Sequence, residues 1–125
     1  MKQISEAFGG RLQNAGITRI QWIALYYVKT KGRISQRDLS NLMYVKDSSA
    51  GRLIDRLERD GLIERERNDI DRRVIFILLT EKGDKLISSL MPIGVKFNDD
   101  LVVGIDEKEL LIYEKVLNKM ISNIT

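Results

Sequence analysis

Residues 35–83 read SQRDLSNLMYVKDSSAGRLIDRLERDGLIERERNDIDRRVIFILLTEKG, and this stretch decides the fold. Its second half places a group of charged residues, 65–73, directly before six consecutive apolar residues, 74–79. A buried strand explains the apolar run, whereas the charges before it lack enough partners to be buried. The segments on either side of the charges therefore predict a β-hairpin that packs on the domain while its polar tip projects into solvent.

Two helices are expected before this hairpin. Ser35, followed three residues later by Asp38, resembles a capping box and predicts a helix over 36–43. After a short connection, residues 46–61 carry apolar side chains at the spacing of one helix face, namely Ala50, Leu53, Ile54 and Leu57. Gly61 is expected to close this helix as a left-handed cap. The two helices form a helix-turn-helix, and the projecting hairpin after it makes a winged helix.

The outer face of the second helix carries a candidate reading surface. At about 100° per residue, the positions opposite the apolar stripe are Ser48, Arg52, Asp55 and Arg59, with Gly51 beside them. Small polar residues followed by one arginine suit a helix that enters the major groove of DNA. A solvated face with surface ion pairs explains the same pattern equally well, so this helix alone leaves both interpretations open.

The whole stretch resembles the MarR-type winged helix-turn-helix transcriptional regulators. The closest segments are RLIDRLERDGLIERE (52–66), DRR (71–73) and LTEKG (79–83), in the order and spacing of that family, and residues 101–124 look like its last helix. The resemblance implies a mostly α-helical winged helix with a small β-hairpin and with dimerisation helices at both ends. It also implies a cytoplasmic homodimer, a repressor, that binds specific double-stranded DNA through the major groove with its helix and the minor groove with its wing.

The resemblance also assigns roles to single residues. The groove-facing part of the recognition helix would be Ser48, Ser49, Gly51 and Arg52. Gly51 stands where the family often has threonine or serine, which removes one contact with DNA. In the wing, Arg73 would reach the minor groove, Asp71 would hold it, and Arg72 would contact a phosphate. A local ion pair worth under about 1 kcal/mol is the alternative explanation for Asp71 and Arg73.

The start of the first helix of the motif is a further candidate. Ser35 and Gln36 lie where a helix N-terminus could contact a DNA phosphate. Simple capping of the helix explains the same two residues at least as well.

The ends of the chain predict a dimer. Asp106 and Glu109 predict the start of a final helix whose apolar positions are Leu110, Tyr113, Leu117, Met120 and Ile124. Residues 18–80 are expected to form a complete DNA-binding core. The apolar faces of the helices of 1–15 and 81–125 therefore have few partners within the same chain. They are expected to cover one another across a two-fold axis, as in the family; a four-helix cap within a monomer is the alternative.

An effector pocket is expected where the two layers meet, at Trp22, Tyr26, Tyr27, Met91 and Phe97. Many members of the family bind small aromatic or phenolic effectors there, so the resemblance implies such a ligand. Plain core packing is the favoured explanation of these residues, because the helix over 19–29 is apolar on nearly all sides and is expected to be buried on both.

Composition limits the other classes of function. The chain has no cysteine and no histidine, which removes thiol and imidazole catalysis and the commonest metal ligands, so neither an enzyme nor a metal or cofactor is expected. No apolar run approaches the roughly 20 residues of a membrane span. Residues 33–73 hold ten Lys/Arg and nine Asp/Glu, so a DNA surface requires charges sorted onto one face. A winged helix that contacts proteins instead of DNA is the alternative function.

Overall fold

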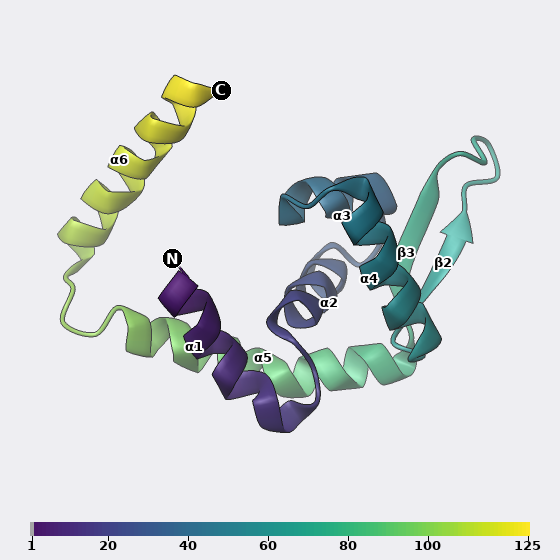
Figure 1. The fold of residues 1–125 in the computed structure, drawn as a ribbon, viewed down its shortest axis with the longest axis horizontal. Helices are drawn as coiled ribbons and strands as arrows, with labels where there is room; N and C mark the ends of the chain where they lie inside the picture. Colours follow the sequence, from purple (N-terminus) through teal and green to yellow (C-terminus); the bar gives the residue numbers. More distant parts are fainter. Residues whose placement is uncertain (1) are drawn as a thin grey trace. The chain divides into compact units, whose positions relative to one another are not determined.

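The computed structural model describes residues 2–125 (Figure 1). Its elements in chain order are α1 (Lys2–Leu12), a 3₁₀ turn (Gln13–Ala15), α2 (Arg19–Lys31), β1 (Ile34–Ser35), α3 (Gln36–Met43), α4 (Asp47–Arg59), β2 (Ile63–Arg67), β3 (Ile75–Leu79), α5 (Glu81–Leu101) and α6 (Glu107–Ile124). Two compact units result, the first ending at Val95 and the second being Lys96–Thr125, so the boundary falls within α5. This is the predicted winged helix, mostly α-helical with a small sheet.

Side-chain caps start the helices of the first unit where the sequence predicted them. Thr18 Oγ1 accepts a hydrogen bond from the backbone N–H of Gln21 at 3.2 Å, and Gln21 Oε1 accepts one from the N–H of Thr18 at 2.9 Å. At the start of α3, Ser35 Oγ accepts from the N–H of Asp38 at 3.0 Å. Each bond satisfies a backbone donor that the first turn of a helix leaves free.

The end of α4 turns the chain into the hairpin. Gly61 has a φ of +75°, which favours glycine. The N–H of Leu62 donates to the carbonyl oxygen of Leu57 at 2.9 Å, and the Leu62 side chain is buried. The left-handed cap is therefore confirmed. The helix itself is shorter than the predicted 46–61, since its last residue is Arg59.

The sheet has three antiparallel strands in the order β1-β3-β2. Arg67 pairs with Ile75 next to the loop of the hairpin, Ile63 pairs with Leu79 at its open end, and on the other side of β3 Ile34 pairs with Ile77. The two-residue β1 is too short to show a periodic pattern in the sequence, so its pairing was not predicted. The second strand was predicted to be buried as a whole, but only Ile77 is fully buried and its neighbours are half-buried. One of them, Phe76, is covered by the guanidinium of Arg33 at 3.9 Å from the ring centre.

The core of the first unit lies between its helices and the sheet. Its fully buried large side chains are Leu12, Leu25, Val28, Leu39, Ile54, Leu57, Ile63, Ile77 and Ile87. Helix α2 contributes four buried residues, and its other apolar residues are half-buried, which agrees with a helix covered on more than one side.

Two glycines allow α5 to approach its neighbours closely. A Cβ atom at Gly83 would lie 1.9 Å from the carbonyl oxygen of Leu62, and one at Gly94 would lie 2.6 Å from Cζ2 of Trp22. Both distances are far below van der Waals contact. The helix therefore packs backbone to backbone against the end of the helix-turn-helix and backbone to ring against α2.

The second unit consists of the last turn and a half of α5, a turn with Gly104 at φ +81°, and α6. The side chain of Asp106 caps α6, since Oδ1 accepts from the N–H of Glu109 at 2.8 Å. Helix α6 has no buried residue, and its exposed apolar side chains include Leu111, Ile112, Tyr113, Val116, Leu117, Met120, Ile121 and Ile124. Between residues 2 and 125, every helix is too short or too polar to span a membrane.

Candidate nucleic-acid interface

The outer face of α4 carries the four residues proposed for the recognition helix. Ser48, Ser49 and Arg52 are exposed and Gly51 is half-exposed, while the opposite side of the helix is buried. Within residues 2–125, Arg52 forms no ion pair, so its guanidinium is available to an external partner. A Cβ atom at Gly51 would meet nothing within 4 Å, so packing inside the domain does not require glycine there.

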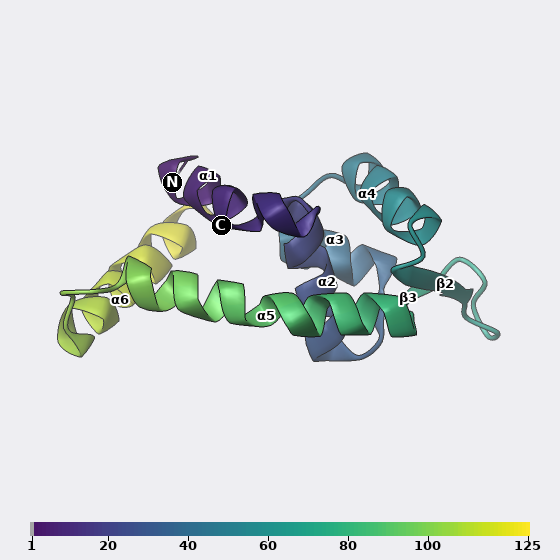
Figure 2. The same cartoon turned by 90° about the horizontal axis from the view of Figure 1, so that it is seen from below.

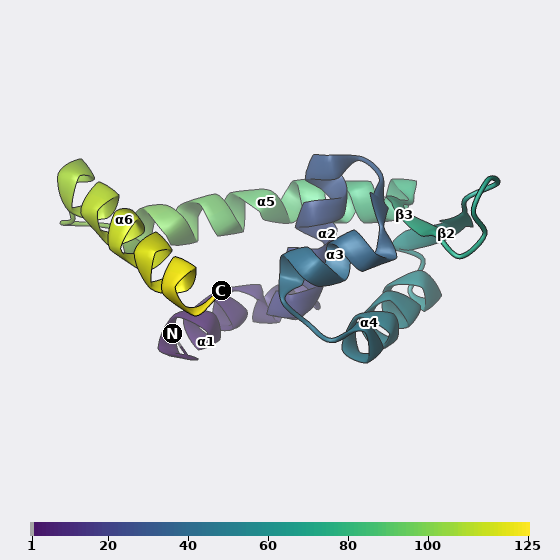
Figure 3. The same ribbon diagram turned by 90° about the horizontal axis from the view of Figure 1, so that it is seen from above.

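The loop between β2 and β3, residues 68–74, projects past the end of α4 in the view of Figure 1 and in the views from below and above (Figure 2, Figure 3). Asn68 closes it. Its Oδ1 accepts hydrogen bonds from the backbone N–H of Ile70 at 2.8 Å and of Asp71 at 3.2 Å. The N–H of Asn68 donates to the carbonyl of Val74 at 3.0 Å. Asparagine commonly folds a turn in this way, which was the signal in the sequence for a role that our prediction omitted.

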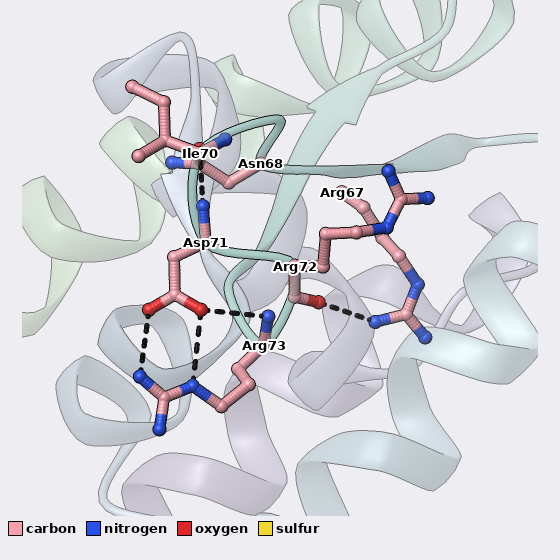
Figure 4. Close-up of polar contacts among 6 residues, drawn as sticks. All are labelled: Arg67, Asn68, Ile70, Asp71, Arg72 and Arg73. Atoms are coloured by element: carbon pink, nitrogen blue, oxygen red, sulfur yellow. Dashed lines mark hydrogen bonds and ion pairs between the residues drawn. The ribbon is translucent and has the colours of Figure 1, made fainter.

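Within this loop, Asp71 holds Arg73 by two bonds to the guanidinium (Figure 4). Arg73 Nε lies 3.1 Å from Asp71 Oδ1, and Nη2 lies 3.3 Å from Oδ2. The backbone N–H of Arg73 also donates to Oδ1 at 3.1 Å. These bonds, the side-chain ones first, lower the pKa of Asp71. The Arg73 side chain is nevertheless 91% exposed, so the pair orients the arginine without burying it.

Arg72 lies on the opposite side of the same loop from Arg73. Its carbonyl oxygen accepts a hydrogen bond from Nη1 of Arg67 at 2.8 Å, and its side chain points away from the Arg73 pair (Figure 4). The side chain is exposed. Consecutive arginines therefore extend from opposite sides of the loop, and two different groups of a partner could be contacted at once.

The start of α3, the start of α4 and the loop border one hollow of about 530 Å³. Ser35, Gln36 and Arg37 line it from α3, Ala50 from α4, and Asp71 and Arg73 from the loop. Ser35 Oγ already caps α3. Capping was the simpler of the two interpretations of this residue, the other being a phosphate contact. Gln36 Oε1 is buried and has no hydrogen-bond partner among the described residues.

The aromatic residues named as an effector pocket are only partly gathered. Trp22 stacks on Tyr26 with ring centres 5.3 Å apart, and Tyr26 contacts Tyr27 edge to face at 5.8 Å. Trp22 Nε1 donates to the carbonyl oxygen of Leu90 at 3.1 Å in a buried position. Both Tyr26 and Tyr27 are half-buried. The tryptophan is thus fully engaged within the first unit, as core packing requires.

The other two pocket residues lie on α5. Met91 is half-buried in the first unit, and Phe97 belongs to the second unit, where it is buried. Among residues 2–125, no group of three or more carboxylates is arranged to hold a metal ion.

A helix-turn-helix followed by a sheet whose loop presents an arginine defines a class, the winged helix-turn-helix proteins. Within this class, a model of the MarR family matches residues 15–74. A transcriptional regulator of the helix-turn-helix type from Bacillus subtilis, YsmB, is 30% identical over 109 residues, which cover 87% of this chain and 75% of YsmB. The chain belongs to the MarR family of DNA-binding transcriptional regulators.

Solved structures agree with this membership. MepR of Staphylococcus aureus, in its complex with DNA, superposes with a TM-score of 0.89 at 26% identity, over 98% of this chain and 90% of MepR. BpsR of Bordetella bronchiseptica, whose DNA binding is regulated by 6-hydroxynicotinic acid, superposes with a TM-score of 0.84 at 20% identity, over 95% of this chain and 85% of BpsR. The second likeness concerns the fold alone.

Proposed function

We propose that the protein is a homodimeric repressor in the cytoplasm, with α4 in the major groove of its operator and the 68–74 loop in the minor groove. The observation that carries this proposal is the geometry of Arg73, whose exposed guanidinium is oriented by Asp71 on a projecting loop. An arginine held in this way suits the narrow, negative minor groove. The protein acts by binding and not by catalysis, and it needs no metal or cofactor.

The roles within the interface follow from reach and exposure. We assign base contacts to Arg52, supported by its exposed guanidinium, which pairs with none of the described residues, and close approach to the small residues Ser48, Ser49 and Gly51. Arg72 and the start of α3, at Ser35 and Gln36, would contact phosphates on either side of the groove.

We further propose that residues 18–80 form the DNA-binding core and that 1–15 and 81–125 are dimerisation helices. The apolar side chains that α6 exposes support a second copy as their cover, because soluble monomers rarely leave such a stripe uncovered. Sedimentation at micromolar concentration should give twice the chain mass of 14.4 kDa, and a single-chain mass at high concentration would reject the dimer.

We also assign a small aromatic effector to the cluster around Tyr26 and Tyr27, with Met91 from the part of α5 in the same unit. The regulation of BpsR by an aromatic acid supports this class of ligand. Because Trp22 is the single tryptophan and stacks on Tyr26, binding should change its fluorescence. A panel of aromatic acids that changes neither this fluorescence nor DNA affinity would leave core packing as the whole role of the cluster.

The experiment that tests the interface is a salt titration of DNA affinity on a selected operator and on random DNA. Arg52→Ala should cost about 1–3 kcal/mol at the selected site and relax the preference for one base. Arg73→Ala should weaken binding to both DNAs and reduce the slope of log affinity against log salt by roughly one phosphate contact. Asp71→Ala should produce part of the Arg73→Ala effect, since the arginine then loses its orienting partner.

Lys85→Ala provides the control, because it removes a cation that is exposed on α5 and that, among the described residues, pairs with Glu81 of its own helix. Its salt slope and affinity should equal those of the wild type. If Arg73→Ala also leaves both unchanged, the loop does not contact DNA. The alternative, a winged helix that binds proteins, would then be favoured, and weak salt dependence of its complexes would support it.

A further inference from the structure

The first strand of the hairpin carries an arginine that contacts the recognition helix along its length. From β2, Arg65 reaches Asp55 with Nη2 at 2.6 Å from Oδ1, and Glu58 with Nη1 at 3.3 Å from Oε1. Nη2 also approaches the carbonyl oxygen of Gly51 at 3.5 Å. The three partners follow one another at i, i+4 and i+7, so one guanidinium spans two turns of α4.

This arrangement is not explained by stability alone. The Arg65 side chain is only 24% exposed, and its Nε is buried without a hydrogen-bond partner among the described residues, which is unfavourable. The carboxylates it meets are 66% and 42% exposed, and ion pairs so open to solvent stabilise a fold little. Its nitrogens are directed at α4, so Arg65 is also poorly placed to contact DNA itself.

The contacts do join the two elements that are proposed to read DNA. Helix α4 carries Arg52, and the hairpin that begins with β2 carries Arg73. Apart from the tight turn at Gly61, the bridge from Arg65 is the polar link, among the described residues, between α4 and β2. The angle between helix and hairpin decides whether both arginines can enter their grooves together.

We propose that Arg65 is a positioning residue for operator recognition, which holds the hairpin at a fixed angle to the recognition helix through Asp55, Glu58 and the Gly51 carbonyl. It also neutralises two carboxylates that would otherwise repel the DNA backbone. The planar fork of arginine is required, since a lysine ammonium at this position cannot serve partners on two helical turns at once. This inference rests on the proposed DNA-binding function.

The positioning role and the neutralising role predict different losses of DNA affinity when Arg65 is replaced. Neutralisation acts on all DNA alike, whereas a wrong angle weakens only the site where both grooves must be engaged. Arg65→Gln should therefore lower affinity for the selected operator about tenfold more than for random DNA, a ratio that corresponds to 1.4 kcal/mol. Arg65→Lys keeps the charge but should still lose most of the preference for the operator over random DNA. Both variants should melt within a few degrees of the wild type.

A triple variant separates the two effects. Asp55→Asn and Glu58→Gln, added to Arg65→Gln, remove the repulsive carboxylates and should restore affinity for random DNA while the operator-to-random ratio stays low. Arg33→Gln is the matched control, because it removes another arginine bridge to β2, at Glu66, that does not involve α4. Its ratio should equal that of the wild type.

Two results overturn the positioning role. The first is a wild-type ratio in Arg65→Gln, which would leave uniform repulsion as the whole effect. The second is a ratio fully restored in the triple variant, which would attribute the loss to the unpaired carboxylates and not to the angle. If Arg65→Gln does not fold, Arg65→Lys gives the same test of the ratio. A wild-type protein that does not prefer any selected duplex over random DNA would instead refute the proposed function, and the role of Arg65 with it.

Discussion

Gly94→Ala tests how rigidly α2 and α5 are packed together. The added Cβ would lie 2.6 Å from Cζ2 and 2.7 Å from Cη2 of Trp22, so the ring or the helix must move by roughly 0.8–1 Å to restore ordinary contact. The ring has little freedom to move. Its Nε1 is bonded to the Leu90 carbonyl at 3.1 Å, its face is stacked on Tyr26, and Phe8 meets it edge to face at 5.0 Å.

The expected magnitude follows from two opposing terms. Overpacking of a well-packed site costs about 1–3 kcal/mol. Replacing glycine by alanine inside a helix returns about 0.8–1 kcal/mol of helix propensity. We therefore expect Gly94→Ala to lower the free energy of unfolding by about 0–2 kcal/mol, and to lower the melting temperature accordingly, by roughly 4–8 °C for each kcal/mol.

The assay is a double-mutant cycle with Trp22→Leu, followed by chemical denaturation. When the large ring is absent, Gly94→Ala should become stabilising by up to about 1 kcal/mol, so the coupling between the two positions should be about 1–3 kcal/mol. Equal effects of Gly94→Ala in both backgrounds would refute the close packing of ring and helix. A stabilising effect in the wild-type background would refute it as well.

Three further outcomes are expected. Gly83→Ala should destabilise the fold by more than about 3 kcal/mol in thermal or chemical melts, because its Cβ would meet the Leu62 carbonyl oxygen, which is backbone and has no rotamer to change; a mild effect would show that the contact is loose. Gly51→Ala should raise the free energy of unfolding by about 0.5–1 kcal/mol, since its Cβ meets nothing and its φ is not positive; a lower melting temperature would contradict this. The pKa of Asp71 is lowered, so its pair with Arg73 is complete above the usual aspartate pKa and is lost only as pH falls through the lowered value. The difference in DNA affinity between Asp71→Asn and the wild type should therefore be constant from about pH 5 to about pH 9; a change near neutral pH would exclude this pair as its origin.

Local signals in the sequence predicted much of the fold. The caps at Thr18 and Ser35 and the left-handed Gly61 depend on residues within four positions of each other, and all three are confirmed. The Asp71–Arg73 contact is equally local, and it too is present in the structure. It forms within a turn, closed by the bond from the N–H of Val74 to the Asp71 carbonyl, and not in an extended strand.

Contacts between distant residues were not predictable in the same way. The pairing of β1 with β3 joins segments some forty residues apart, and a strand of two residues has no periodicity to reveal it. The bridge from Arg65 to α4 and the hollow beside Gln36 both depend on how the hairpin lies against the helices. Gly83 and Gly94 gave no signal in the sequence, because the reason for glycine lies in backbone and ring atoms of other elements.

The Asp71–Arg73 pair has a consequence for the entropy of association. A free arginine on an exposed loop samples many rotamers, and fixing them on binding costs about 0.5–1.5 kcal/mol. In this protein, part of that ordering is present without DNA, because the Asp71 carboxylate accepts hydrogen bonds from both the guanidinium and the backbone N–H of Arg73. The loop itself is closed by Asn68 in the same manner. If the loop enters a groove as proposed, the tip would need little rearrangement, and more of the favourable energy of the arginine contact would appear as affinity.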